Sequence, residues 1–275
     1  MSTRTVPILE LTEPGGAERR LVRVETIPPQ THFAPYFDWE TVPTYTACGT
    51  KLGQLLRACM SAAARAIGDE NGHGFLPSRV LELVMTEDVV RNEIQSQKKG
   101  LTPQTIIDVM FRGNEATRTR PGGAKATTYV LIFAILALVG KLDVVDDFVG
   151  NKNGPSDQDL PLTMKRLDTG EVELWRREEQ RQMRCFDDWS DVQLESFHGF
   201  QWRLLVPIFA LNNDRTIKHY KLDRFDVLPW WKTGTEDEGG EGIVTKVRVH
   251  PLCHDYHELL KSVYFSPFTE LLFSI

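Results

Sequence analysis

The apolar stretch YVLIFAILALVG, residues 129–140, constrains the fold of this chain most strongly. Eleven consecutive apolar residues precede its glycine, and charged residues follow from Lys141 onward. A helix that spans a membrane needs about 20 apolar residues, so this run is too short to cross one. It predicts instead a buried helix over 129–139 at the centre of a globular core, with Phe133 and Leu136 inaccessible to solvent.

Composition narrows the class of protein. The chain has 275 residues, 41% hydrophobic and 25% charged, which is typical of a soluble globular protein with one large or two ordinary domains. Its net charge of -6 argues against a nucleic-acid partner, because phosphate binding needs basic patches. The first residues form no apolar leader and the cysteines form no CxxC pair, so we expect an intracellular protein of the cytoplasm or the nucleus. The four cysteines are Cys48, Cys59, Cys185 and Cys253.

Two regions precede the C-terminal part of the chain. Residues 1–45 are rich in proline and predict an irregular arm, in which short pieces such as RLVRVETI alternate weakly, like strands. Residues 46–210 predict a helical domain, because apolar side chains recur at helical spacing from Leu52 onward. Within this domain the charged run 171–184 predicts a solvated helix. The stretch RLDTGEVEL is compatible with either a tight hairpin or a helix break.

The third region, residues 211–275, predicts a small β-rich segment. Polar and apolar residues alternate in TIKHYKLDRFDVLPWW and in IVTKVRVH, as in half-buried strands. The final stretch YFSPFTELLFSI is expected to pack loosely, like the end of a truncated chain. The alternative is an edge strand that shields an unfinished sheet. The fold class expected from all three regions is α+β, mainly α.

One group of side chains near the C-terminus has metal-binding chemistry. His250, Cys253, His254 and His257 lie within HPLCHDYH, and Cys253 and His257 would share a helix face. A structural zinc site needs four ligands, usually from two separated pairs, and no second pair lies nearby in the sequence. We therefore predict no metal site and interpret these side chains as satisfied or exposed.

A second group could suggest nucleophilic catalysis. Ser190, His198 and Asp188 are residue types of a hydrolase triad, but nothing near them resembles a nucleophile elbow. No catalytic residue is therefore predicted. The neighbouring aromatic residues are interpreted as core rather than as a binding box, and they are Trp189, Phe197 and Trp202.

An ordered series of segments carries a resemblance to a known family. The segments are FLPSRVLELVMTEDVVRNEI, IFAILALVGKLDVVDDFV, DLPL, CFDDW, FHGFQWRLLVPIF, IKHYKLD, VLPWW and GGEGIVTKVRVHP. In this order they resemble fungal protein-kinase-like proteins over residues 75–257. The resemblance implies a helical N-terminal region followed by the start of a kinase N-lobe, with the rest of the kinase domain missing.

The resemblance suggests an interpretation of the glycines in GGEGIVTKVRVHP as part of a kinase glycine-rich loop. A kinase glycine-rich loop follows G-x-G-x-x-G-x-V, and its backbone N–H groups cover the nucleotide phosphates. Gly239, Gly242 and Val244 fit this pattern, whereas Asp237 stands in place of the first glycine. The resemblance therefore implies a vestigial glycine-rich loop, and without the resemblance the same residues predict a hairpin turn.

Catalysis needs more than this loop. A kinase needs a strand lysine, a catalytic aspartate and a metal-binding aspartate, but no A-x-K, HRD or DFG string follows the loop. We therefore expect no cofactor, with ATP binding only if the kinase domain were complete. The expected function is a non-catalytic, kinase-associated helical module that binds a protein partner or regulates a kinase.

Two other functions remain open from the sequence. The chain could be a fragment or an incomplete gene model of a Ser/Thr kinase that binds ATP. It could also be a self-associating structural protein, which would form a stable oligomer without any effect of nucleotide.

Overall fold

The computed structural model combines helices and sheets, with more residues in helices, as the expected α+β class requires. It describes residues 8–12, 20–25, 51–66, 74–97, 103–112, 128–149, 151, 154–178, 180–210, 220–232, 237–239, 242–255 and 271–274. None of the helices among these residues is long and apolar enough to cross a membrane.

The chain divides into two compact units. We call Val42–Cys59 with Arg79–Leu205 the helical unit. We call Met1–Thr41, Met60–Ser78 and Val206–Ile275 together the sheet unit. The expected divisions at 45/46 and 210/211 lie within five residues of two of these boundaries. The first and third regions form one unit with 60–78, however, and not two separate parts.

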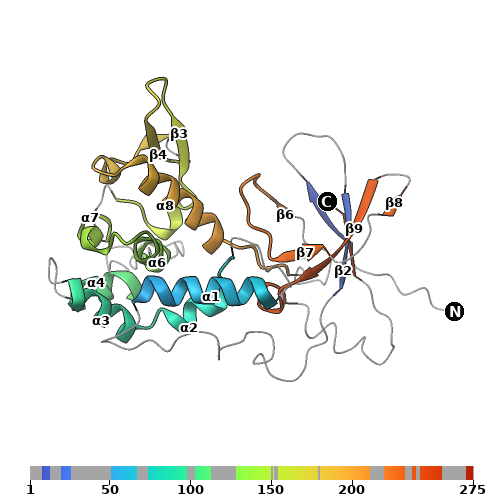
Figure 1. The fold of residues 1–275 in the computed structure, drawn as a ribbon, viewed down its shortest axis with the longest axis horizontal. Helices are drawn as coiled ribbons and strands as arrows, with labels where there is room; N and C mark the ends of the chain where they lie inside the picture. Colours follow the sequence, from blue (N-terminus) through green and yellow to red (C-terminus); the bar gives the residue numbers. More distant parts are fainter. Residues whose placement is uncertain are drawn as a thin grey trace, which may run out of the picture. The chain divides into compact units, whose positions relative to one another are not determined.

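Most helical elements lie wholly or mostly in the helical unit (Figure 1). In chain order they are α1 (Leu52–Ala66), which continues past the unit boundary, α2 (Ser78–Val84), α3 (Glu87–Gln97), α4 (Pro103–Ile107), the π-helical turn η3 (Asp108–Arg112), α6 (Val130–Val139), the 3-10 turn η4 (Leu142–Val144), α7 (Val145–Phe148), the 3-10 turns η5 (Asp157–Asp159) and η6 (Arg184–Phe186), and α8 (Asp191–Leu204).

Helix α6 confirms the prediction of a buried helix within the run 129–139. Every residue from Ile132 to Leu138 is buried, and Phe133 and Leu136 have no exposed surface. The helix ends at Gly140, whose φ of 76° is left-handed and therefore favours a residue without a Cβ atom. Apolar side chains on all faces are typical of a helix that is buried all round.

The N-terminus of α6 is held by a side chain from elsewhere in the unit. One carboxylate oxygen of Asp157 accepts a hydrogen bond from the Ile132 N–H at 3.0 Å. The other accepts from the Thr128 hydroxyl at 2.8 Å. These bonds satisfy a backbone donor that the helix itself cannot pair.

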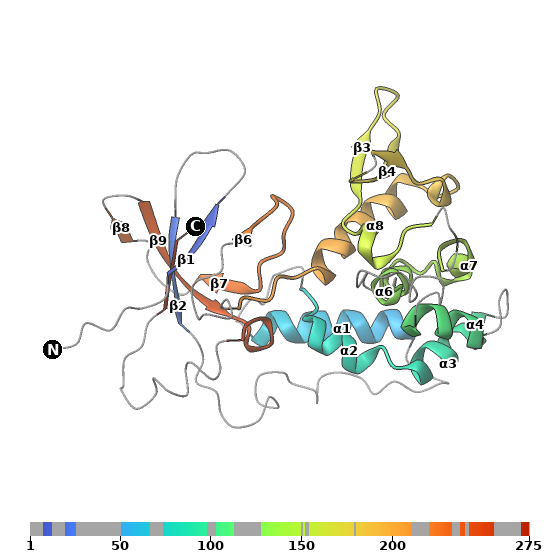
Figure 2. The same ribbon diagram turned by 180° about the vertical axis from the view of Figure 1, so that it is seen from behind.

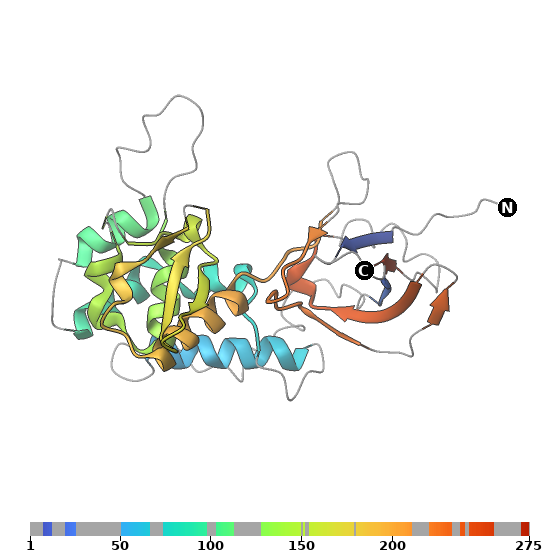
Figure 3. The same cartoon turned by 90° about the horizontal axis from the view of Figure 1, so that it is seen from above.

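Helix α8 lies between α6 and a three-stranded sheet, as the side view of Figure 1 shows; Figure 3 gives the same part of the fold from above. The Gln193 side chain accepts a hydrogen bond from the Ser190 N–H at 3.1 Å, as in a capping box, which starts this helix. The buried Gln201 side chain bonds to both the N–H and the C=O of Leu162 at 2.8 Å each. This amide therefore satisfies the backbone of a segment 39 residues earlier in the chain.

The expectation of a solvated helix over 171–184 is wrong. The three-stranded antiparallel sheet consists of β3 (Thr163–Arg166), β4 (Val172–Arg176) and β5 (Arg181–Gln182) in sequence order. In β4 the buried residues Val172 and Leu174 alternate with more accessible ones, and the strand packs against α8. This period of two outweighs the charge pattern, because it buries one face of the strand.

The same sheet resolves the choice left open for RLDTGEVEL. Strands β3 and β4 pair in antiparallel register, with Arg166 opposite Val172. The turn between them contains Gly170, whose φ of 91° suits glycine. The stretch is therefore a hairpin and not a helix break.

The sheet unit contains a seven-stranded sheet of order β6-β1-β10-β2-β9-β7, in which β8 also pairs with β9 (Figure 2). Its strands are β1 (Ile8–Thr12), β2 (Arg20–Glu25), β6 (Tyr220–Lys221), β7 (Trp230–Lys232), β8 (Asp237–Gly239), β9 (Gly242–Val249) and β10 (Leu271–Ser274). Strand β6 lies within one of the two stretches in which alternation predicted strands, and β7 and β9 each extend one residue beyond them.

Two expectations about the ends of the chain are corrected by this sheet. Strands β1 and β2 lie within residues 1–45, where an irregular arm was expected. Strand β10 lies between β1 and β2 and is neither a loose tail nor an edge strand. In all three strands the backbone groups pair with strands far away in the sequence, so the sequence could not show which segments they pair with.

Candidate functional site

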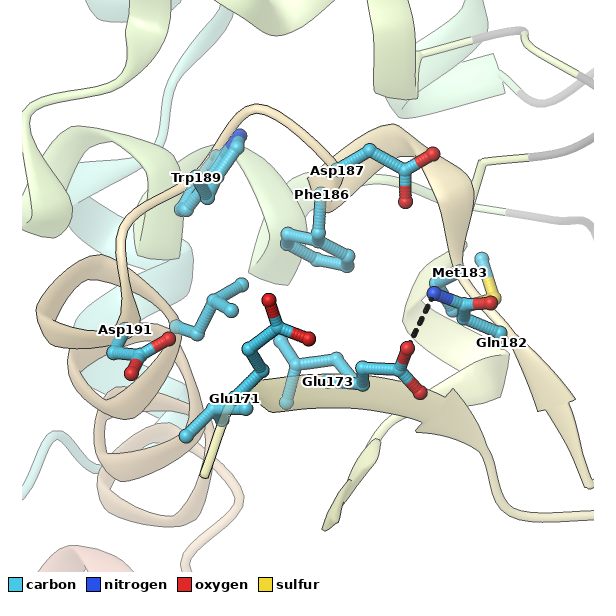
Figure 4. Close-up of a pocket in the computed structure, with 11 residues that line it drawn as sticks. Glu171, Glu173, Gln182, Met183, Phe186, Asp187, Trp189 and Asp191 are labelled. Carbon is cyan, nitrogen blue, oxygen red and sulfur yellow. Dashed lines mark hydrogen bonds between the residues drawn. The ribbon is translucent and has the colours of Figure 1, made fainter. Parts of the chain in front are cut away.

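The helical unit contains a pocket with an acidic rim, which we call the acidic pocket (Figure 4). Its volume is about 310 Å³. The polar lining residues are Glu171, Glu173, Gln182, Asp187 and Asp191, and the apolar ones are Val172, Leu174, Met183, Phe186, Trp189 and Leu194. Four carboxylates and no basic side chain therefore line the pocket.

Three segments position these side chains. Strand β4 and the residue before it supply Glu171 and Glu173. Asp187 directly follows the turn η6, and Asp191 stands in the first turn of α8. A carboxylate in the first turn of a helix is favoured by the positive end of the helix dipole. The negative charge therefore comes from separate sides of the rim.

A cluster of buried aromatic rings forms the floor. The ring centroids of Phe186 and Trp189 are 5.1 Å apart, and the rings are nearly perpendicular at 79°. Phe197 packs against both, at 4.9 Å from Phe186 and 6.0 Å from Trp189. The expected core role of Trp189 and Phe197 is thus confirmed, and the floor is part of the packed core.

The rim carboxylates differ in their partners. Glu173 accepts hydrogen bonds from the Gln182 amide (Figure 4) and from the Trp175 indole, both at 2.9 Å, so its orientation is fixed. Asp187 and Asp191 are exposed, and neither side chain forms a hydrogen bond or ion pair with the described residues. Glu171 points its carboxylate toward the Phe186 ring (Figure 4). This arrangement offers negative charge above an aromatic floor, which suits a cationic group.

The glycines singled out from the sequence lie in a hairpin of the sheet unit. Strands β8 and β9 are antiparallel, with Gly239 opposite Gly242 and Asp237 opposite Val244. Two residues, 240 and 241, connect the strands, and they lie outside the described residues. The strand-turn-strand expectation is confirmed, whereas a nucleotide-binding role for Gly239, Gly242 and Val244 stays a prediction.

The histidines near the C-terminus are mostly buried. His250, Cys253 and His254 are each at most 2% exposed, and His257 lies outside the described residues. The His250 Nδ1 accepts a hydrogen bond from the Leu252 N–H at 3.1 Å. Burial lowers the pKa of His250 from 6.5 to about 4. Within the described ranges no three His, Cys, Asp or Glu side chains lie close enough together to hold a metal ion.

The triad-like residues are not brought together. Ser190 is the N-cap of α8, and His198 lies eight residues further along the chain, inside the helix. At 1.5 Å per residue their backbones are about 12 Å apart. The Nε2 of the buried His198 accepts a hydrogen bond from the Trp202 indole at 3.3 Å. This histidine therefore has a structural partner on its own helix.

Two cysteines are also unsuited to nucleophilic chemistry. Burial raises the pKa of Cys59 to about 11 and that of Cys185 to about 12. The thiolate is the reactive form of cysteine, so both side chains are poor nucleophiles at neutral pH.

Sequence reasoning missed the acidic pocket because it assigned 171–184 to a helix. On a helix, Glu171 and Glu173 would point in different directions. On a strand, residues two apart share a face, so both glutamates reach the same rim. The alternation of acidic and apolar residues in EVEL was the signal that could have identified this strand.

Comparison of the sequence with protein-family models and curated proteins, and of the fold with solved structures, found no match.

Proposed function

We propose that this chain is a non-catalytic, kinase-associated module that binds a protein partner through a basic segment of that partner. The acidic pocket carries the binding part of the proposal, since four carboxylates surround an aromatic floor and none of its lining residues is basic. The kinase association rests on the ordered series of segments and on the hairpin β8–β9, whose glycines face each other.

The binding step follows from electrostatics. An ion pair at an exposed rim contributes at most about 1 kcal/mol, and salt screens it. A partner therefore needs several basic residues, or one whose cation also reaches the aromatic floor. Because Asp187 and Asp191 form no ion pair with the described residues, binding would not have to break an existing one.

The test compares two fluorescent peptides of equal length and apolar content, one strongly basic and one strongly acidic. Anisotropy should show binding of the basic peptide only, and binding should weaken from low to high NaCl. The variant Asp187→Asn/Asp191→Asn should lose most of this affinity. Equal binding of both peptides, or an unchanged affinity of the variant, would refute the proposal.

A matched control variant is Asp88→Asn/Asp168→Asn. Asp88 is exposed in the first turn of α3, as Asp191 is in α8, and Asp168 is exposed in a turn, as Asp187 is. Both double variants therefore remove the same charge from similar positions. Only the pocket variant should change the affinity, whereas equal losses would indicate an effect of net charge alone.

A second candidate function is the ATP-binding remnant of a Ser/Thr kinase. The direct pairing of Gly239 with Gly242 at the hairpin favours it. Calorimetric titration of Mg-ATP should nevertheless show weak or no binding, because Asp237 replaces the first loop glycine and brings negative charge near the phosphates. Micromolar binding that disappears in Gly242→Asp would establish a nucleotide site. If the purified protein, after removal of contaminating kinases, still transferred labelled phosphate to protein substrates, the non-catalytic assignment would be contradicted.

A further inference from the structure

We propose that the group seated in the acidic pocket is the guanidinium of an arginine side chain of the partner, not the ammonium of a lysine. This inference rests on the proposed binding function and adds the chemical identity of the recognised group. It follows from the placement of the carboxylates, the nature of the floor and the size of the pocket.

The carboxylates are spread around the rim and do not converge on one point. They belong to β4 and the residue before it, to the residue after η6 and to the first turn of α8. An ammonium is a compact point charge, whereas a guanidinium is planar and carries five N–H donors in a rigid fork. The guanidinium can therefore donate to carboxylates on different sides at the same time.

Glu173 is held in an orientation that can accept two hydrogen bonds from a guanidinium. Each of its two oxygens already accepts one hydrogen bond, from Gln182 and from Trp175. A carboxylate oxygen has two lone pairs, so each oxygen can accept one further hydrogen bond. The fixed orientation lowers the entropy lost when a planar donor pairs with both oxygens.

The aromatic floor also favours arginine. Guanidinium groups are less strongly hydrated than ammonium groups and stack on aromatic faces. The helical unit contains cation contacts of both kinds, since the guanidinium carbons of Arg57 and Arg203 lie 4.9 and 5.1 Å from the Phe200 centroid and the Lys165 ammonium lies 3.6 Å from the Trp175 centroid. The Lys141 ammonium lies 5.5 Å from the Trp189 centroid without lining the pocket, and Phe186, with an exposed fraction of 4%, is the other aromatic residue of the lining.

The size of the pocket suits a single side chain. A volume of about 310 Å³ is at the lower end of the roughly 300–1,000 Å³ found for small-molecule sites. One extended side chain can therefore enter, while the neighbouring residues of the partner stay outside and contact the rim.

The experiment uses the full chain labelled with ¹⁵N at tryptophan. The probes are four peptides, Ac-GGRGG-NH2 and its lysine, citrulline and glycine counterparts, and the readout is the indole N–H signals of Trp175 and Trp189. Citrulline keeps the shape of arginine but has no charge. The arginine peptide should shift these signals, with binding about fivefold tighter than that of the lysine peptide. The citrulline and glycine peptides should leave them unchanged.

The pocket and control double variants complete the design. Asp187→Asn/Asp191→Asn should weaken arginine binding, while Asp88→Asn/Asp168→Asn should not, and the tryptophan spectra report whether each variant is folded. Equal affinity for arginine and lysine peptides would overturn this inference but leave the proposed function standing. Free Nα-acetyl-arginine amide that binds as tightly as the arginine peptide would overturn the assignment to a partner protein. Shifts caused by the citrulline peptide would overturn the role of charge.

Discussion

The helical unit and the sheet unit differ in how far apart in the sequence their paired segments lie. In the helical unit the strands β3, β4 and β5 follow one another within 163–182. In the sheet unit β2 pairs with β9, where Arg20 lies opposite Ile243. Local patterns were therefore sufficient to identify the central helix of the first unit, but they could not reveal which segments pair in the second.

The largest expected effect tests the core of the helical unit. Replacing Phe133 with Ala removes a ring without exposed surface and should lower the free energy of unfolding by about 3–5 kcal/mol. Urea unfolding followed by circular dichroism measures it. Phe225→Ala is the control, because Phe225 is 41% exposed and should cost less than about 1 kcal/mol. Equal losses would show that α6 is not central.

The next prediction concerns a buried base in the sheet unit. Burial lowers the pKa of His250 from 6.5 to about 4. Between these two pH values the unfolded state binds the proton and the folded state does not. The contribution of neutral His250 to the free energy of unfolding is therefore fully present above pH 6.5 and is lost as the pH falls toward 4. The shift corresponds to at most about 3 kcal/mol.

Two measurements check this pH dependence. The imidazole signals of His250 in the folded chain should titrate well below 6.5. The loss of stability between pH 6.5 and 4 should also be smaller in His250→Gln than in the wild type. An equal loss of stability in both proteins would assign the pH dependence to other groups. A buried, neutral histidine would then no longer distinguish the sheet unit from the helical unit.

The third prediction tests whether the helical unit, like the sheet unit, depends on a contact between residues far apart in the sequence. Gln201→Leu leaves the N–H and C=O of Leu162 without the amide that pairs them. Unsatisfied buried polar groups should cost about 1–3 kcal/mol. Gln95→Leu, at an exposed position of α3, should stay within about 0.5 kcal/mol of the wild type in the same unfolding measurement. If Gln201→Leu left the free energy of unfolding unchanged, the helical unit would not depend on this long-range contact.

The smallest expected effect concerns the N-terminus of α6. Asp157→Ala removes the acceptor of the Ile132 N–H and of the Thr128 hydroxyl. Loss of a helix cap typically costs about 1 kcal/mol. Hydrogen exchange of the first amides of α6 should accelerate, whereas Asp168→Ala, in an exposed turn, should leave it unchanged. No change in either variant would show that the apolar run holds the helix end without a cap.

Features that depend on neighbouring residues along the chain could be predicted from the sequence. The unbroken run of apolar residues required the buried helix α6, and the apolar spacing from Leu52 onward required α1, because each pattern completes a hydrophobic face within one element. The alternation in IVTKVRVH determined β9 in the same way.

Only the tertiary structure decided which distant segments meet. The partners of strands β1, β2 and β10 became known only from the sheet, since a strand leaves its backbone groups unsatisfied until a partner strand pairs with them. The acidic pocket likewise exists because β4 and the start of α8 lie against each other. Its carboxylates are ordinary surface charges in the sequence, and the aromatic floor that packing places beneath them turns them into a candidate site.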